Sequence, residues 1–345
     1  MRWLALACAC VVASDEVVIS YEGSIDANLG GLGNRLLGLI SAKMFADLAR
    51  ARFAVVDERF TGLARFSELF EYPPALRWNA SHDAYDPTCK LMFENHKCGQ
   101  TLAHLNSRRS GHEKLMAKLH PESSTLRLRF PQCDVFRVVS NMYFGALYRP
   151  NATRPSFGDV VASIARPSAA IAARVRDATE GWEPANHAVA VHLRSFFKPD
   201  LGAVAGCLCD VAARTSYAAT RRQRDPPPAV KQAWLISDSA RLQVELRDML
   251  AARCGLGARL SANAYDLAAG EDSRAHRRGP DIVDAAFDHA LARTARLFLG
   301  TPGSSFSDTA VGLHPDASRL RLPDCALIPA RDHAPPNHKW CRQVG

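Results

Sequence analysis

Side chains that suit an anion follow four apolar segments of this chain. An arginine at the end of a buried strand grips phosphate with two parallel hydrogen bonds, glycines let a backbone approach a ligand closely, and serines before a helix add donors. The residues of this kind are Gly31, Gly33, Asn34 and Arg35, then His192 and Arg194, then Asp238 and Ser239, and finally Ser304, Ser305 and Ser307. Together they predict an anion site of the size of a diphosphate.

A βαβ unit is predicted around the first group of these residues. The corner Leu-Gly-Gly-Leu-Gly-Asn-Arg-Leu occupies 29–36. A β-branched run at 17–21 suits a buried strand before it, apolar residues at helical spacing follow over 36–48, and a second strand is predicted at 53–57. The corner therefore lies at a strand-to-helix junction, where the first amide groups of a helix point outward and bind anions.

The glycines of this corner have two interpretations. Gly31 and Gly33 permit a close approach to a phosphate, and Asn34 is expected to cap the helix that follows. Glycine at a tight turn is also common without any ligand, only these two glycines match the dinucleotide-binding pattern, and the P-loop lysine is missing. The corner alone does not identify a phosphate site, so it needs partners elsewhere in the chain.

The second half of the chain alternates predicted helices with predicted strands. The helices are expected at 164–178, 240–253 and 282–296, and the strands at 187–194, 233–237 and 297–300. Such alternation predicts a parallel sheet, in which ligands bind beyond the carboxyl ends of the strands. His192, Arg194, Asp238 and the serines of 304–307 are therefore expected to converge.

Each of these groups also has a purely structural interpretation. A lone buried histidine such as His192 is more often a core residue than a catalyst, and Arg194 could anchor a structural carboxylate. Asp238 and Ser304, each with the serine that follows it, are ordinary residues at the start of a helix. Four strand ends that converge are harder to explain in this way than any one of them.

The chain is long enough for two domains, because it has 345 residues of which 47% are hydrophobic. The stretch 60–124 is expected to form loops and short helices, and the proline-containing stretch 148–157 reads as a linker. The predicted boundaries are a signal peptide at 1–14 and domains at 15–150 and 151–345, with polar insertions at 218–230 and 261–279. A strand is expected at 136–140, and residues 143–145 are expected to close the first domain.

The formal net charge of +8 fits an acidic ligand such as a nucleotide. The densest basic clusters, at 221–224 and 276–278, lack the interleaved aromatic residues of nucleic-acid-binding surfaces. Nucleic acid is therefore not expected as a partner.

The first residues have the charge order and length of a signal peptide, because Met1 and Arg2 precede an apolar run at 3–13. The run is shorter than the roughly 20 residues of a membrane-spanning helix, so a membrane anchor would need sequence before Met1. Glycosylation sequons at Asn79 and Asn151 indicate the same compartment. We expect a protein of the secretory pathway, in the Golgi lumen.

Eight cysteines lie beyond the predicted signal peptide, and an even number in an oxidising compartment predicts disulfides. Cys89 with Cys98 is expected to close a local loop, while the other pairings stay open. The run Cys207-Leu208-Cys209 lacks the spacing of a zinc site and has no histidine pair nearby. We therefore expect no metal there.

The motifs occur in the order seen in the fucosyltransferase superfamily, which the chain resembles from Gly30 to Leu313. The matching motifs are Gly31-Leu32-Gly33-Asn34-Arg35-Leu36, His192-Leu193-Arg194, Ser237-Asp238-Ser239 and Ser304-Ser305-Phe306-Ser307. The first motif is most similar to the plant xyloglucan α1,2-fucosyltransferases. The resemblance implies an α/β fold of two Rossmann-like domains facing a cleft, of the GT-B kind, with GDP-fucose as donor and no cofactor or metal.

The resemblance also implies roles for single residues. Arg194 would neutralise the β-phosphate of the departing GDP, and Asp238 would lie near the guanine or ribose. The donor pocket would be lined at its mouth by Gly31, Gly33, Asn34 and Arg35, and at the phosphate and fucose by Ser304, Ser305 and Phe306. No Asp-x-Asp metal signature is present, and without a metal the leaving diphosphate must be stabilised by arginine and amide donors.

Other features leave the mechanism open. His192 and Asp26 are candidate general bases by type and position only. Many relatives have a second arginine at the position of Ser195, and the plant branch lacks that arginine as well. Fewer charges therefore stabilise the leaving group.

The leading hypothesis is an inverting fucosyltransferase that acts on a polysaccharide or glycoprotein glycan. The alternatives are a glycosyltransferase with another nucleotide sugar and a non-catalytic glycan-binding relative.

Overall fold

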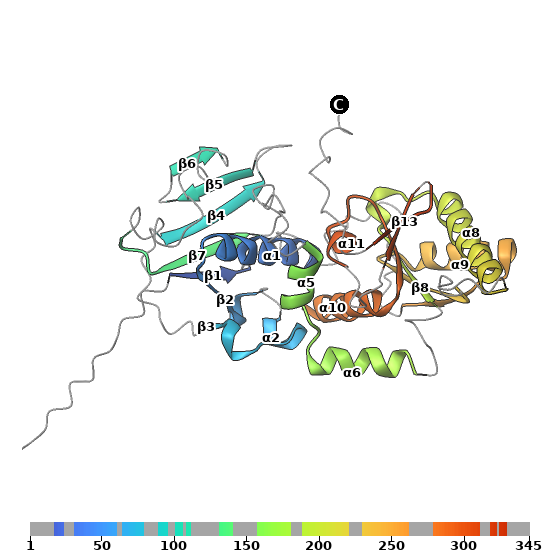
Figure 1. Ribbon diagram of the computed structural model, residues 1–345, viewed down its shortest axis with the longest axis horizontal. Coiled ribbons are helices and arrows are strands. Elements are labelled where there is room, and N and C mark those ends of the chain that lie inside the picture. The colour runs from blue at the N-terminus through green and yellow to red at the C-terminus, as the bar shows by residue number, and fades with distance from the viewer. Residues whose placement is uncertain are drawn as a thin grey trace, which may run out of the picture.

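The computed structural model has two β-sheets side by side along its long axis, each with helices against it (Figure 1). The structure describes residues 17–23, 31–60, 64–78, 89–95, 101–105, 108–111, 131–140, 157–180, 188–220, 230–261, 279–310, 318–322 and 324–329. Every predicted catalytic and donor-binding residue lies in these ranges. The candidate base Asp26, both sequons and the predicted signal peptide lie outside them.

The first sheet is built around the predicted βαβ unit. Its strands are β1 (Val18–Glu22), β2 (Arg52–Val56), β3 (Arg77–Trp78), β4 (Lys90–Asn95), β5 (Thr101–Leu105), β6 (Arg108–Gly111) and β7 (Val135–Ser140). Their order is β3-β2-β1-β7-β4-β5-β6, with β1 parallel to both β2 and β7 and with β5 and β6 antiparallel additions at one edge. The strands predicted at 17–21, 53–57 and 136–140 are confirmed.

The expectation of loops and short helices over 60–124 is wrong in part, because β3 to β6 lie in this stretch. These strands are short and mix polar with apolar residues, as in Lys-Leu-Met-Phe-Glu-Asn of β4, so they show no regular alternation. Hydrogen bonds to a neighbouring strand define them. Short helical segments are also present there, namely α2 (Phe66–Leu69) and the 3-10 turn η2 (Pro74–Leu76), and another 3-10 turn, η1 (Asp57–Arg59), directly precedes the stretch.

Helix α1 (Leu32–Leu48) covers one face of the first sheet and starts one turn earlier than its apolar pattern. Gly31 is the residue before its first turn, and no side chain caps that end. Asn34 lies inside the first turn, so the prediction that it caps the helix is wrong. The reason is that the helix begins at Leu32, so that the extended Gly31 takes the cap position and Gly33 lies inside the first turn.

The second sheet contains the remaining predicted strands. Its members are β8 (Ala188–Leu193), β9 (Gln232–Ser237), β10 (Gly257–Leu260), β11 (Leu297–Gly300), β12 (Ser318–Arg321) and β13 (Ala326–Pro329). The order is β10-β9-β8-β11-β12-β13, and all pairs are parallel except β12 with β13. The helices that follow these strands are α8 (Leu201–Thr220), α9 (Ala240–Cys254), α10 (Gly279–Thr294) and α11 (Ser305–Thr309). A 3-10 turn, η5 (Ser195–Phe197), follows β8.

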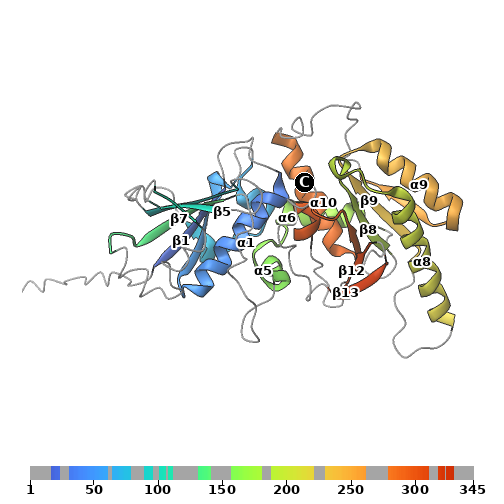
Figure 2. The same ribbon diagram turned by 90° about the horizontal axis from the view of Figure 1, so that it is seen from above.

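Successive residues of β8 face opposite sides of the second sheet. Val189, Val191 and Leu193 join the hydrophobic core under α8 and α9, on the outer side of the molecule (Figure 2). Ala190 joins the other core, with α10 and the first sheet. By the same alternation His192 and Arg194 belong to the side of the sheet that faces the N-terminal half.

The two sheets share the core to which Ala190 belongs, because its buried side chains come from β1 and α1 as well as from β9, β11 and α10. The connection between the sheets contains α5 (Phe157–Ile164) and α6 (Ala169–Ala178) instead of the single helix predicted at 164–178. Pro167 interrupts that helix, and Ser168 caps α6 by accepting a hydrogen bond from the Ile171 amide at 3.3 Å. The Ser168 hydroxyl also donates to the Glu68 carbonyl at 2.8 Å, which ties the connection to α2 in the N-terminal half.

Three disulfides are formed among the described residues: Cys89–Cys133, Cys207–Cys325 and Cys209–Cys254. The predicted pairing of Cys89 with Cys98 is wrong. Cys89 directly precedes β4 and Cys133 precedes β7, and these two strands are neighbours in the sheet, so the bond follows strand order rather than closeness in sequence.

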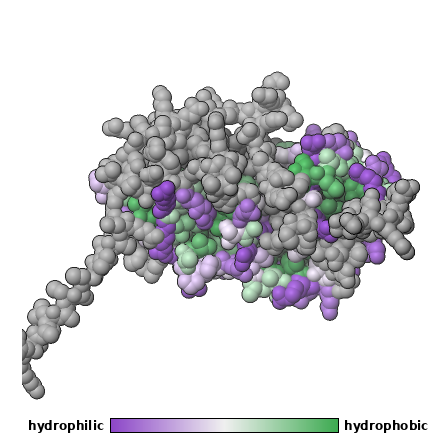
Figure 3. All heavy atoms as spheres, in the orientation of Figure 1, coloured by the Kyte–Doolittle hydropathy of each residue, from purple (hydrophilic) through white to green (hydrophobic). Residues whose placement is uncertain are grey.

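No helix of the described residues is long and apolar enough to cross a bilayer. On the described part of the face drawn in Figure 3, hydrophilic and hydrophobic residues are interspersed over both halves of the molecule.

Candidate functional site

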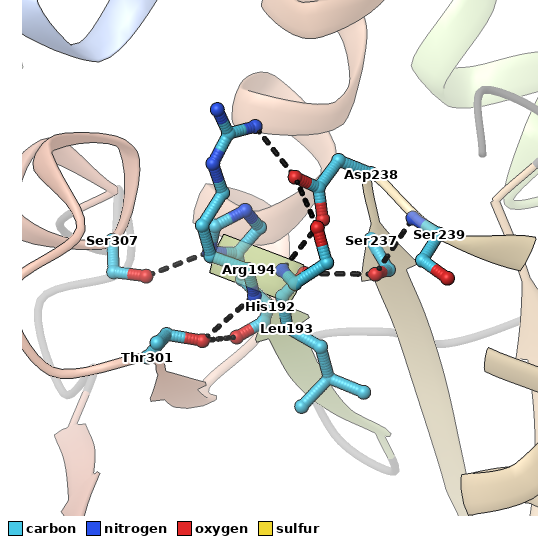
Figure 4. Close-up of polar contacts among 9 residues, drawn as sticks. His192, Leu193, Arg194, Ser237, Asp238, Ser239, Thr301 and Ser307 are labelled. Atoms are coloured by element: carbon cyan, nitrogen blue, oxygen red, sulfur yellow. Dashed lines mark hydrogen bonds and ion pairs between the residues drawn. The ribbon is translucent and has the colours of Figure 1, made fainter. Parts of the chain in front are cut away.

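The ends of β8 and β9 bring an arginine and a carboxylate together (Figure 4). Arg194 Nη1 lies 2.8 Å from Asp238 Oδ2. The Asp238 side chain is 8% exposed, whereas that of Arg194 is 32% exposed. Asp238 also accepts hydrogen bonds from the Ser195 amide at 2.8 Å and the Ser195 hydroxyl at 3.0 Å. The carboxylate therefore fixes one edge of a guanidinium that still reaches solvent.

The backbone around Arg194 is held from both neighbouring strands. The Thr301 hydroxyl, after β11, donates to the His192 carbonyl at 2.8 Å and accepts from the Arg194 amide at 2.9 Å. From β9, the Ser237 hydroxyl donates to the Leu193 carbonyl at 2.8 Å. Because three strand ends are joined by side-chain hydrogen bonds, the arginine is presented on a rigid backbone.

His192 is buried, and its Nδ1 shares a hydrogen bond of 2.7 Å with the Ser307 hydroxyl. Burial, with the nearby charges of Arg194 and Arg319, lowers the pKa of His192 from 6.5 to about 3. The imidazole is therefore neutral at physiological pH. Its ring stacks on Phe306, with 4.4 Å between the ring centroids.

Residues 304–306 form the start of α11, with Ser304 as its cap residue and Ser305 and Phe306 in its first turn, and this helix lies directly on the second sheet. Gly300 makes this contact possible, because a Cβ there would lie 2.6 Å from the Ser307 Cβ. Arg319 of β12 donates from Nη2 to the Ser307 carbonyl at 2.7 Å. Ser307 is thus buried between three strands.

The glycine-rich corner of the first sheet meets this same turn. A Cβ on Gly33 would overlap the Phe306 amide nitrogen and would lie 2.5 Å from the Ser305 carbonyl carbon. Gly33 therefore allows α1 of one half to touch the start of α11 in the other. Gly31, by contrast, is exposed, and no atom of the described residues lies within 4 Å of the position its Cβ would occupy. Asn34 is half-buried in the first turn of α1.

Arg35 does not lie at the mouth of a pocket, as the resemblance had implied. It is 1% exposed, and its Nη1 donates to the Phe60 carbonyl at 3.2 Å inside the core that the two sheets share. The Arg35 backbone carbonyl accepts a hydrogen bond from the Tyr21 hydroxyl at 2.9 Å. This arginine supports the fold of the first sheet.

Sequence reasoning missed four polar residues near the site: Thr301, His289, Asp308 and Arg319. Burial raises the pKa of Asp308 from 3.8 to about 7, against an opposing effect of Arg319, and burial lowers the pKa of Arg319 to about 10. His289 lies edge-on to Phe306, at 5.3 Å between ring centroids. The polar-apolar alternation Arg-Leu-Arg-Leu at 319–322 is a sequence signal that would have placed Arg319 on a strand.

The site combines the Arg194 guanidinium and the Asp238 carboxylate with hydroxyls and backbone amides. This set can bind a phosphate through charge-assisted hydrogen bonds. Within the described part of the chain, no three His, Cys, Asp or Glu side chains are grouped so that they could hold a metal ion.

No family model matches the chain, and no curated protein does. Solved structures of similar fold are fucosyltransferases. NodZ alpha-1,6-fucosyltransferase, co-crystallized with GDP, is 14% identical, with 91% of this chain and 98% of that chain covered and a TM-score of 0.51. A mutant of Arabidopsis thaliana FUT1 with GDP is 13% identical, covers 88% and 70%, and has a TM-score of 0.49. POFUT1 with GDP-fucose is 13% identical, covers 87% and 95%, and has a TM-score of 0.47.

At such identities the likeness concerns the fold. Two mixed α/β units, each with a largely parallel sheet, and a match over nearly the whole length of NodZ confirm the fold class that the motifs predicted. The chain has the two-domain GT-B fold of the alpha-1,6-fucosyltransferase NodZ.

Proposed function

We propose that the protein transfers fucose from GDP-fucose to a hydroxyl group of a glycan, with inversion at the anomeric carbon. The observation that carries this proposal is the convergence of Arg194, Asp238 and the turn at 304–306 at neighbouring strand ends. The fold supports it, because the fucosyltransferase NodZ, which has that fold, was co-crystallized with GDP.

Arg194 is the residue assigned to the leaving group. Negative charge develops on the diphosphate as the bond between the anomeric carbon and the phosphate oxygen breaks, and a positioned cation stabilises that charge. Arg194 supplies this cation through its guanidinium group. Its Nη1 is held by Asp238, and the remaining edge of the fork is assigned to phosphate oxygens.

The acceptor hydroxyl forms its bond to the anomeric carbon from the opposite side and loses its proton to a base. His192 does not suit this role, because it is buried and its Nδ1 is engaged by Ser307. Asp26 stays the candidate base by its position in the chain, before the glycine corner.

We propose a different role for Asp238, which is to hold Arg194 instead of binding the guanine or ribose. Both of its carboxylate oxygens have partners in Arg194 and Ser195. We infer that it orients the arginine. Gly31, Gly33 and Asn34 at the start of α1, together with Ser304, Ser305 and Phe306, are proposed as the walls of the donor site. Arg35 is not included.

The remaining features of the proposal concern the whole chain. The N-terminal domain at 15–150 would bind the acceptor glycan, the C-terminal domain at 151–345 would bind GDP-fucose, and no metal would be required. The three disulfides fit an oxidising compartment. We propose the secretory pathway, with the Golgi lumen as the site of action, reached by the signal peptide at 1–14 or by an anchor before it.

A nucleotide panel followed by an acceptor screen tests the function. GDP, UDP, CMP and ADP are added to the protein at millimolar concentration, and thermal unfolding is recorded. A ligand at ~100 times its dissociation constant stabilises by about 2.7 kcal/mol, and we expect this for GDP alone. Labelled GDP-fucose is then offered with glycan acceptors, with and without a chelator, and we expect transfer in both cases.

The outcomes separate the alternatives. A shift with UDP and none with GDP would assign the site to another nucleotide sugar. A shift with GDP but no transfer to any acceptor would favour the non-catalytic glycan-binding relative. The absence of a shift with every nucleotide would refute the donor site.

A further inference from the structure

Ser307 is the point at which three strands hold the turn at 304–306. His192 of β8 bonds to its hydroxyl at 2.7 Å, Arg319 of β12 donates to its carbonyl at 2.7 Å, and Gly300 of β11 lies beneath its Cβ. The Ser307 side chain has no exposed surface. It therefore cannot contact a donor molecule, although it belongs to the serine-rich motif.

The position of Ser307 determines the position of the residues just before it. Ser304 is the residue before the first turn of α11, and its carbonyl accepts the Asp308 amide at 2.9 Å, so the turn and the helix form one short rigid piece. The Phe306 ring is also fixed, between the stacked His192 ring and the edge of His289. A shift of Ser307 would move the whole piece relative to Arg194.

His192 is suited to hold this piece and unsuited to transfer a proton. Its ring is buried and neutral, and the charged groups that affect it are Arg194 and Arg319, which both disfavour a second proton. One face of the ring is covered by Phe306. The ring is thus a fixed hydrogen-bonding partner of Ser307.

We propose that His192 is a positioning residue that acts through Ser307 and sets the turn at 304–306 relative to Arg194 for binding of a nucleoside diphosphate. The proposal rests on the proposed function, because it names how the same site is held. It corrects the expectation that His192 takes part in catalysis.

A double-mutant cycle tests the proposal. His192→Phe keeps a ring to stack on Phe306 but loses the hydrogen bond, Ser307→Ala removes the hydroxyl with minimal change of volume, and the double variant removes both. His192→Asn restores a polar group near the place of Nδ1. Ser163→Ala is the matched control, because that hydroxyl donates within its own helix α5, to the Val160 carbonyl at 2.8 Å. GDP affinity is measured by calorimetry, and kcat, KM and the pH-rate profile are measured with GDP-fucose.

We expect His192→Phe and Ser307→Ala each to weaken GDP binding about fivefold to tenfold, which is the effect of one lost hydrogen bond. The double variant should be no weaker than either, His192→Asn should recover part of the affinity, and Ser163→Ala should match the parent protein. The pH-rate profile should keep its shape in every variant.

Two results would overturn the inference while leaving the function intact. One is that the parent binds GDP and both single variants bind it equally well. The other is that His192→Asn loses kcat and one limb of the pH profile, since this would identify His192 as a proton-transfer residue. If the parent itself bound no GDP, the proposed function would fail first.

Discussion

At the scale of single residues, the proposed chemistry depends on one arginine held by one carboxylate. Arg194→Ala should lower kcat about 100-fold or more, because a positioned donor to the developing charge is lost. Folding should be nearly unaffected, since the Arg194 side chain is 32% exposed and Asp238 keeps its bonds to Ser195. Initial rates and thermal unfolding check both statements. Arg241→Ala, which removes an arginine that is 76% exposed, is the control that should change neither.

Two buried groups near the site make opposite contributions to the pH dependence of stability. The pKa of His192 falls from 6.5 to about 3 on folding, so the unfolded chain binds the extra proton in that window and stability decreases as pH falls. The pKa of Asp308 rises from 3.8 to about 7, so the folded chain binds the extra proton and stability decreases as pH rises through that window.

Asp308→Asn should therefore raise the unfolding temperature at pH 8 and have much less effect at pH 4. The substitution removes a carboxylate whose ionisation is unfavourable in the folded chain above a pKa of about 7, whereas near pH 4 the folded chain holds Asp308 protonated. Each kcal/mol of stability corresponds to roughly 2–4 °C in a domain of ordinary size. Scanning calorimetry at the two pH values measures the difference. An equal gain at both would show that packing, and not ionisation, is responsible.

At the scale of elements, the glycine corner brings α1 of the N-terminal half into contact with α11 of the C-terminal half, in addition to its proposed role in anion binding. Gly33→Ala should weaken GDP binding about tenfold or more and cost about 1–3 kcal/mol of stability, because its Cβ would overlap Phe306 and push α1 away from α11. Gly206→Ala in α8 is the matched control, since its Cβ would lie 3.8 Å from a terminal nitrogen of Arg253, which is an ordinary contact. If both substitutions were tolerated equally, the close approach would not matter for the site.

The sequence predicted the elements whose patterns are local and not those defined by distant partners. Strands such as β8 are nearly continuous apolar runs, and polar groups after them were correctly expected to converge. The edge strands β4 to β6 depend on pairing across the sheet, and the Cys89–Cys133 bond depends on which strands are neighbours. Burial of Arg35 could not be foreseen either, because its partner is the backbone carbonyl of Phe60 and carries no sequence signature.

The same limit applies to the candidate site. Arg194 and Asp238 were identified by their places after strands, but their pairing with each other was visible only in three dimensions. The sequence predicts Ser307 as part of an anion site, but the residue is fully buried. A serine-rich segment has the same sequence whether its hydroxyls face a ligand or the sheet. Motif membership thus predicted which residues gather and not which of them face the donor.

At the scale of the whole molecule, the two sheets are expected to unfold as one unit. Buried side chains of β1 and α1 belong to the same core as those of β9, β11 and α10, and α10 and α6 lie between the sheets (Figure 2). Arg293 of α10 adds a buried hydrogen bond to the Ala165 carbonyl in the connection between the halves. A core of this extent leaves little room for independent domain motion.

Hydrogen exchange with and without GDP tests this coupling. If the halves are one cooperative unit, GDP at ~100 times its dissociation constant should slow the slowest amides of β1 and β9 by the same factor of about 100, because both exchange only on global unfolding. GDP is proposed to contact mainly the second sheet, so independent halves would show protection in β9 and none in β1. Amides of the exposed strand β10 exchange by local opening and serve as the internal control, with little change expected in either case. Equal protection of β1 and β9 would mean that the contact at Gly33 and the shared core transmit the binding free energy across the molecule.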